Sequence, residues 1–162
     1  MLTKAKKSIA LFIAAVMLFT LAACSINSPG TKEYVDEVSS QMLEAVNLTR
    51  KLKRQQDELD IRIQKDESEI TKTLEGLDAV YTKLLKLDAP SRYEDLNSEL
   101  RTSAEAALGY INELTSLVKT AGKTGDDSLY IQEGMHIMSD YEVSYNELVD
   151  INSRITTKYR ND

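Results

Sequence analysis

Apolar residues recur along most of this chain at intervals of three and four positions, the spacing of residues on one face of an α-helix. Polar and charged residues fill the positions between them. Beyond residue 24, no stretch alternates apolar and polar residues as a half-buried strand would. The pattern therefore predicts an all-α protein. Within residues 31–88 the repeat is carried by Val35, Val38, Met42, Ala45, Leu52, Leu59, Ile63, Ile70, Leu77, Val80, Leu84 and Leu87.

Residues 31–88 contain a single glycine and no proline, so the pattern alone leaves open whether they form one helix or two. One helix would be about 85 Å long at 1.5 Å per residue, and a helix of that length is typical of a coiled coil. The polar segment Gln55–Ser68 favours a turn instead, with Asp66 and Glu69 as a cap for the second helix. We predict two helices of about 26 and 22 residues, with the single coiled-coil-like helix as the alternative.

Pro90 marks the next boundary, because proline disfavours helical geometry in the residue before it. Ser91 and Glu94 have the spacing of a capping box, so a third helix is expected from about Arg92 to Thr120. Within it, Ser103–Gly109 is rich in small residues that would let a neighbouring helix approach closely. The predicted buried stripe consists of Tyr93, Leu96, Leu100, Ala104, Ala107, Ile111, Leu114 and Val118.

The segment Ala121–Gly125 is predicted to be a loop, in which Gly122 ends the third helix. A fourth helix is expected from about Ser128 to Tyr159. Its candidate N-caps are Asp126, Asp127 and Ser128. Its predicted buried stripe consists of Ile131, Met135, Met138, Tyr141, Tyr145, Leu148, Ile151 and Ile155.

Long helices joined by short connections predict an antiparallel bundle of four helices, in one domain that covers residues 31–162. The alternative is a bundle of three helices, the first very long and coiled-coil-like. The repeat over residues 31–88 also makes homo-oligomerisation a hypothesis.

The first 23 residues have a different composition from the rest. Lys4, Lys6 and Lys7 precede the uncharged, mostly apolar run Ile9–Ala23. A transmembrane helix needs roughly 20 apolar residues, so this run is too short to remain as a span. Lysines, an apolar core and then small residues predict a secretory signal peptide over residues 1–23, which is removed.

The signal peptide ends in Leu21-Ala22-Ala23-Cys24, which resembles the lipobox of bacterial lipoproteins. The resemblance implies that Leu21, Ala22 and Ala23 are recognised by a dedicated peptidase that cuts before Cys24. It also implies that Cys24 carries a diacylglyceryl group, which holds the protein at the extracytoplasmic face of the cell membrane. Residues 24–30 would then form the lipidated tether. Cys24 is the only cysteine, so a disulfide within the chain is excluded.

The charge balance restricts the possible partners. The chain has a net charge of −6, and loss of the three leader lysines leaves 17 Lys and Arg against 26 Asp and Glu, a net charge of −9. Nucleic acid requires clustered cations, so this balance argues against it as a partner. The one small basic run, Lys51–Arg54, is interpreted as a solvated helix surface, with a contact to anionic wall polymers or lipid headgroups as the alternative.

Two short motifs suggest chemistry, and neither is complete. Gly122-Lys123-Thr124 matches the end of a P-loop, but the required earlier glycine is replaced by Leu117, and no strand precedes it. Glu133 and His136 have the spacing of di-iron bundles, but His136 is the only histidine, so two such motifs cannot form. We therefore predict no catalytic residues, no metal, no cofactor apart from the lipid, and no enzymatic activity.

In its overall layout the chain is similar to the small helical lipoproteins of Gram-positive bacteria, some of which are described as cell-wall-binding. The resemblance implies a binding or structural module at the cell envelope, with an envelope protein or a cell-wall polymer as partner. The alternative function is a small-ligand-binding or sensor bundle with a cavity between its helices.

Overall fold

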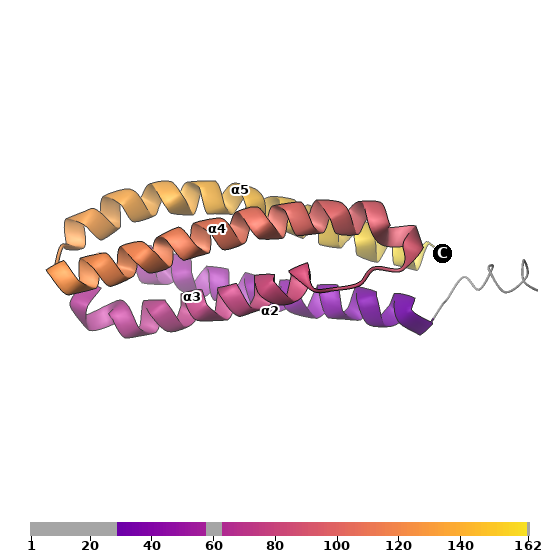
Figure 1. Cartoon of the computed structure of the whole chain (residues 1–162), viewed down its shortest axis with the longest axis horizontal. Helices are drawn as coiled ribbons and strands as arrows, with labels where there is room; N and C mark the ends of the chain where they lie inside the picture. The colour runs from indigo at the N-terminus through magenta and orange to yellow at the C-terminus, as the bar shows by residue number, and fades with distance from the viewer. Residues whose placement is uncertain (1–28, 58–62, 162) are drawn as a thin grey trace, which may run out of the picture.

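The computed structural model describes residues 29–57 and 63–161, which form four long α-helices and one short 3-10 helix. In chain order these are α2 (Pro29–Asp57), α3 (Ile63–Leu85), η2 (Ser91–Tyr93), α4 (Glu94–Thr124) and α5 (Asp127–Arg160). The described residues contain no strand. The helices run alternately up and down the long axis of an elongated bundle (Figure 1). The predicted all-α antiparallel four-helix bundle is therefore confirmed, and the three-helix alternative is wrong because α2 and α3 are separate helices.

α4 packs against both α3 and α5, and α2 completes the bundle by packing against α3 and, less extensively, α5. The start of α2 and the end of α5 lie at one end of the bundle, whereas the turn from α4 to α5 lies at the other (Figure 1). We call the first end the Pro29 end and the second the Gly125 end.

The interior is built from aliphatic and tyrosine side chains of all four long helices, and each aliphatic side chain buried in this way contributes roughly 1.5–3 kcal/mol. All eight predicted positions of the third helical stripe are buried. Large side chains that are almost fully buried include Met42, Leu52, Ile70, Leu74, Leu77, Tyr81, Leu84, Tyr93, Leu100, Tyr130 and Tyr141.

The predicted stripe is wrong in the first two turns of α5. Ile131 and Met135 are 44% and 67% exposed, and the interior positions are Tyr130 and Gly134 instead. A Cβ added at Gly134 would lie 3.6–3.7 Å from Gln56, Leu117 and Tyr130, which is ordinary van der Waals contact. Glycine has no apolar side chain, so a pattern that counts apolar residues does not mark Gly134 as an interior position.

Two predicted helix ends are also corrected. The capping box of Ser91 and Glu94 does not form, because Ser91 lies in η2 and no side chain caps η2 or α4. α4 continues through Gly122 and ends at Gly125, which adopts a φ of 68° and donates its N–H to the carbonyl of Ala121 (2.7 Å). The left-handed conformation favours glycine, and this requirement arises at Gly125 and not at Gly122.

Side chains at the Gly125 end fix the starts of α5 and α3. Asp126 is the N-cap of α5 and accepts a hydrogen bond from the N–H of Leu129 (3.0 Å), as predicted. The neighbouring Asp127 Oδ1 accepts from the N–H of Ile63 (2.8 Å), so α5 supplies an acceptor for the start of α3. Asp66, the predicted cap of α3, lies within its first turn instead.

The predicted signal peptide, the lipobox and residues 24–28 of the tether lie outside the described residues, as does Leu59. α2 begins at Pro29, two residues before the expected start of the domain. Within residues 29–57 and 63–161, none of the helices combines the length and the apolar character needed to cross a bilayer.

Candidate functional site

A chain of buried hydroxyl groups joins three helices in the middle of the bundle. The hydroxyl of Tyr141 on α5 lies 2.6 Å from Thr49 Oγ1 on α2 and 2.6 Å from the hydroxyl of Tyr81 on α3. The rings of Tyr81 and Tyr141 meet edge to face, with centroids 6.3 Å apart. Because the three residues are almost fully buried, these hydrogen bonds fix the register of α2 against α3 and α5.

Burial keeps these phenols neutral. It raises the pKa of Tyr141 to about 12, and it raises the pKa of Tyr81 further with an added contribution from the charge of Tyr141. A phenol with so high a pKa stays protonated at neutral pH. The buried hydroxyls therefore serve as hydrogen-bonding groups that link the three helices.

A second polar link lies at the Pro29 end. The hydroxyl of Tyr34 on α2 donates to Asn97 Oδ1 on α4 (3.1 Å), and burial raises the pKa of Tyr34 to about 12. The ring of Tyr34 packs against Tyr93 with centroids 5.6 Å apart. Lys158 Nζ lies 5.1 Å from the centroid of Tyr93, so a cation from α5 covers this aromatic pair.

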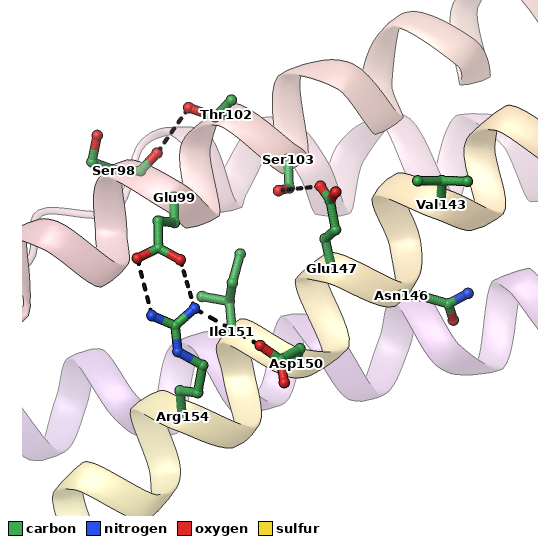
Figure 2. A pocket seen from close by; sticks show the side chains of 10 residues that line it. All are labelled: Ser98, Glu99, Thr102, Ser103, Val143, Asn146, Glu147, Asp150, Ile151 and Arg154. Carbon is green, nitrogen blue, oxygen red and sulfur yellow. Dashed lines mark hydrogen bonds and ion pairs between the residues drawn. The ribbon is translucent and has the colours of Figure 1, made fainter.

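A groove of about 840 Å³ lies between α4 and α5 (Figure 2), and we call it the α4/α5 groove. Arg154 on α5 faces Glu99 on α4 and donates two hydrogen bonds to its carboxylate, at 2.6 and 3.0 Å. These bonds lower the pKa of Glu99 and raise that of Arg154. Asp150 is 3.8 Å from the same guanidinium group. The lining residues are Ser98, Glu99, Thr102, Ser103, Val143, Asn146, Glu147, Asp150, Ile151 and Arg154.

The middle of this groove combines apolar and acidic groups. Ser103 donates to Glu147 Oε2 across the groove (3.0 Å), and the small side chain of Ser103 leaves room for this contact. Ile151 forms a buried apolar floor, whereas Val143 is 59% exposed (Figure 2). The groove therefore offers an apolar contact beside carboxylates.

A smaller pocket of about 420 Å³ lies between α2 and α5, nearer the Gly125 end. Buried Tyr130 and Met138 contribute to its lining, together with the exposed side chains of Ile131 and Met135. Other residues that line it are Lys53, Gln56, Ser139 and Glu142, of which Lys53 and Glu142 form an ion pair at 2.9 Å. Burial raises the pKa of Tyr130, and Gln56 is the polar neighbour that opposes the shift.

The two motifs of the sequence fall on helices. Gly122-Lys123-Thr124 forms the last turn of α4, where the Glu67 carboxylate packs against Gly122, so these residues do not wrap a phosphate. Glu133 and His136 are both exposed on α5. Within the described residues no group of three or more His, Cys, Asp or Glu is placed to hold a metal ion.

Sequence reasoning identified Ser103 within its small-residue stretch, but it missed the Glu99–Arg154 pair. Asp150 and Arg154 have the i,i+4 spacing of an ion pair within one helix, and this spacing was the sequence feature that could have drawn attention to Arg154. The partner on α4 depends on how two helices are aligned, which a single-helix pattern does not contain.

Comparison of the chain with family models, with curated proteins and with solved structures found no match.

Proposed function

We propose that the protein is a lipid-anchored binding module of the cell envelope, which presents the α4/α5 groove to an envelope protein. A diacylglyceryl group on Cys24 holds it at the extracytoplasmic face of the cell membrane. The support for the anchor is the order of lysines, apolar run and Leu21-Ala22-Ala23-Cys24 in the sequence. Two acyl chains give stable anchoring, whereas one chain binds only marginally.

Labelling with a fatty-acid analogue tests the anchor. Cells that produce the wild-type chain are expected to incorporate the label into the protein, and the Cys24→Ala variant is expected to remain unlabelled and to retain its leader. A mature protein that begins elsewhere than at Cys24, or a wild-type chain without label, would falsify the anchoring half of the proposal.

The observation that carries the binding role is the combination of a packed interior with an open groove. The buried hydroxyls of Thr49, Tyr81 and Tyr141 are bonded to one another and need no ligand. At the α4/α5 groove, in contrast, a large apolar side chain, Val143, remains 59% exposed beside Glu147. An exposed apolar side chain with a polar rim is typical of a protein-binding surface.

The charge of the groove favours a protein over an anionic wall polymer. Arg154 is paired with Glu99, so the carboxylates of Glu147 and Asp150 leave a negative surface. A polyanion would be repelled from it, whereas a cationic protein surface would be attracted.

Photocrosslinking on intact cells tests the binding role. A photoreactive residue at Val143 is expected to capture a protein, whereas the same residue at Asn112, which is exposed on α4 outside the groove, is expected to capture none. Equal capture at both positions, or none at either, would contradict a role for the groove.

A small-ligand-binding bundle is the second candidate, and the pocket between α2 and α5 favours it. The buried phenol of Tyr130 borders a space of about 420 Å³ lined by both apolar and polar side chains, a volume within the range of small-molecule sites. A panel of small amphipathic compounds, screened by thermal shift, would contain a stabiliser whose effect falls in the Tyr130→Phe variant. The Tyr145→Phe variant is the matched control, because Tyr145 lies outside this pocket.

A further inference from the structure

Charge is segregated between one stretch of α2 and one stretch of α5. Residues 45–56 of α2 contain four Lys or Arg and no acid, and residues 140–153 of α5 contain four Asp or Glu and no Lys or Arg. One member of each set, Lys53 and Glu142, forms an ion pair within the molecule. The cations of the α2 stretch that remain exposed are Arg50, Lys51 and Arg54, and the exposed acids of the α5 stretch are Asp140, Glu147 and Asp150.

Each charged surface also carries an exposed large apolar side chain. Leu43 on α2 is 64% exposed, and its spacing from Arg50 and Arg54 places all three on the outer face of that helix. Val143 on α5 is 59% exposed and lines the α4/α5 groove, one turn from Asp140. The two surfaces are thus complementary in charge at Arg50 and Asp140, and each offers an apolar contact.

The complementary groups lie at similar heights along the bundle. At 1.5 Å per residue, Leu43 is about 21 Å from the Pro29 end of α2, and Val143 is about 26 Å from the Arg160 end of α5. By the same measure Arg50 is about 32 Å from the Pro29 end of α2, and Asp140 is about 30 Å from the Arg160 end of α5. Because α2 begins and α5 ends at the same end of the bundle (Figure 1), two molecules standing side by side bring Leu43 within about 5 Å of the height of Val143 and Arg50 within about 2 Å of the height of Asp140.

We propose that the occupant of the α4/α5 groove is a second copy of the chain, which places Leu43 of its α2 against Val143 and Arg50 beside Asp140. This inference rests on the proposed function, because it names the partner of the same groove. The contact joins two different surfaces, so it is heterologous and each molecule can bind one neighbour on either side. Tethering to one membrane raises the effective concentration of such a weak contact.

Thiol crosslinking between full-length variants tests this contact. Cells that produce Leu43→Cys and Val143→Cys chains together, treated with a short bismaleimide, are expected to yield a dimer. Cells that produce either variant alone are expected to yield none, and they also measure any background from Cys24. Met135→Cys in place of Val143→Cys is the matched control, since Met135 is equally exposed on α5 but faces the pocket toward α2.

Charge reversal tests the ionic part of the contact. Arg50→Glu in the Leu43→Cys chain is expected to reduce the dimer about fivefold, and Asp140→Arg in the Val143→Cys chain is expected to restore it. Both positions are exposed, and far-UV circular dichroism would verify that the variants remain folded. High salt is expected to lower the yield of dimer from the Leu43→Cys and Val143→Cys chains, as Arg50→Glu does.

The outcomes separate this inference from the proposed function. No dimer, equal dimer with the Met135 control, or dimer from a single variant would each overturn the heterologous contact. If a photoreactive residue at Val143 captures a protein other than the chain itself, the binding module stands and self-association is wrong. Fatty-acid labelling tests for the lipid on Cys24, and its result does not depend on the crosslinking results.

Discussion

Replacing Tyr141 with phenylalanine removes the central hydroxyl of the chain that joins α2, α3 and α5. Tyr141 makes both 2.6 Å contacts, to Thr49 and to Tyr81, so the substitution breaks two hydrogen bonds while it keeps the ring. A buried polar group left without a partner costs about 1–3 kcal/mol. Thr49 and Tyr81 are near enough to interact with each other, which recovers part of this loss. We therefore expect the free energy of unfolding to fall by about 1.5 kcal/mol.

Urea denaturation followed by circular dichroism at 222 nm measures this change. With a slope of about 1.5 kcal/mol per molar urea, the midpoint of the Tyr141→Phe variant is expected to fall by about 1 M at an unchanged slope. Tyr81→Phe leaves the Thr49–Tyr141 bond intact and is expected to cost less. Tyr145→Phe is the control, because Tyr145 is half-buried and stacks on Tyr141 through its ring. If Tyr141→Phe shifts the midpoint no more than Tyr145→Phe does, the hydroxyl chain does not hold the helices in register.

Three further changes test other parts of the fold. Because the folded pKa values of Tyr34 and Tyr141 are about 12 against 10 for an exposed tyrosine, their contribution to stability is complete below pH 10 and is lost as the pH rises from 10 to 12; the midpoint of urea denaturation is therefore expected to fall over that window, and a midpoint that stays constant from pH 10 to 12 would contradict it. Gly109→Ala fills open space on α4 and is expected to raise stability by about 0.5–1 kcal/mol in urea denaturation, whereas Gly125→Ala, at a φ of 68°, is expected to lower it by about 1 kcal/mol; the same sign for both would refute the argument. Asp126→Ala removes the N-cap of α5 and is expected to lower the thermal midpoint by an amount equivalent to about 1 kcal/mol, with Asp126→Asn retaining most of the wild-type value.

The sequence predicted the helices well where an apolar stripe runs without interruption. In η2 and α4 every expected position, from Tyr93 to Val118, is buried. The reason is that apolar residues at helical spacing lie on one face of the helix, so the spacing itself indicates which residues are buried. The separation of α2 from α3 was predicted from composition, since Gln55–Ser68 is the most polar part of residues 31–88.

The details that sequence reasoning missed depend on contacts between helices. Gly134 is an interior position of α5 because Gln56 and Leu117 approach it from neighbouring helices, and glycine gives no apolar signal. Ile131 and Met135 are exposed as a result. The walls of the α4/α5 groove also depend on contacts between helices. Glu99 pairs with Arg154 only because α4 and α5 are aligned so that the two residues face each other.

Because the bundle has four antiparallel long helices, the last helix ends at the same end of the bundle at which the first begins. Arg160 therefore lies at the same end of the bundle as Pro29 (Figure 1). A fluorescent protein or epitope fused after the last residue would be crowded against whatever surface holds the first. The same reporter inserted beside Gly125 would stand about 50 Å away, at the opposite tip, where antibodies have free access.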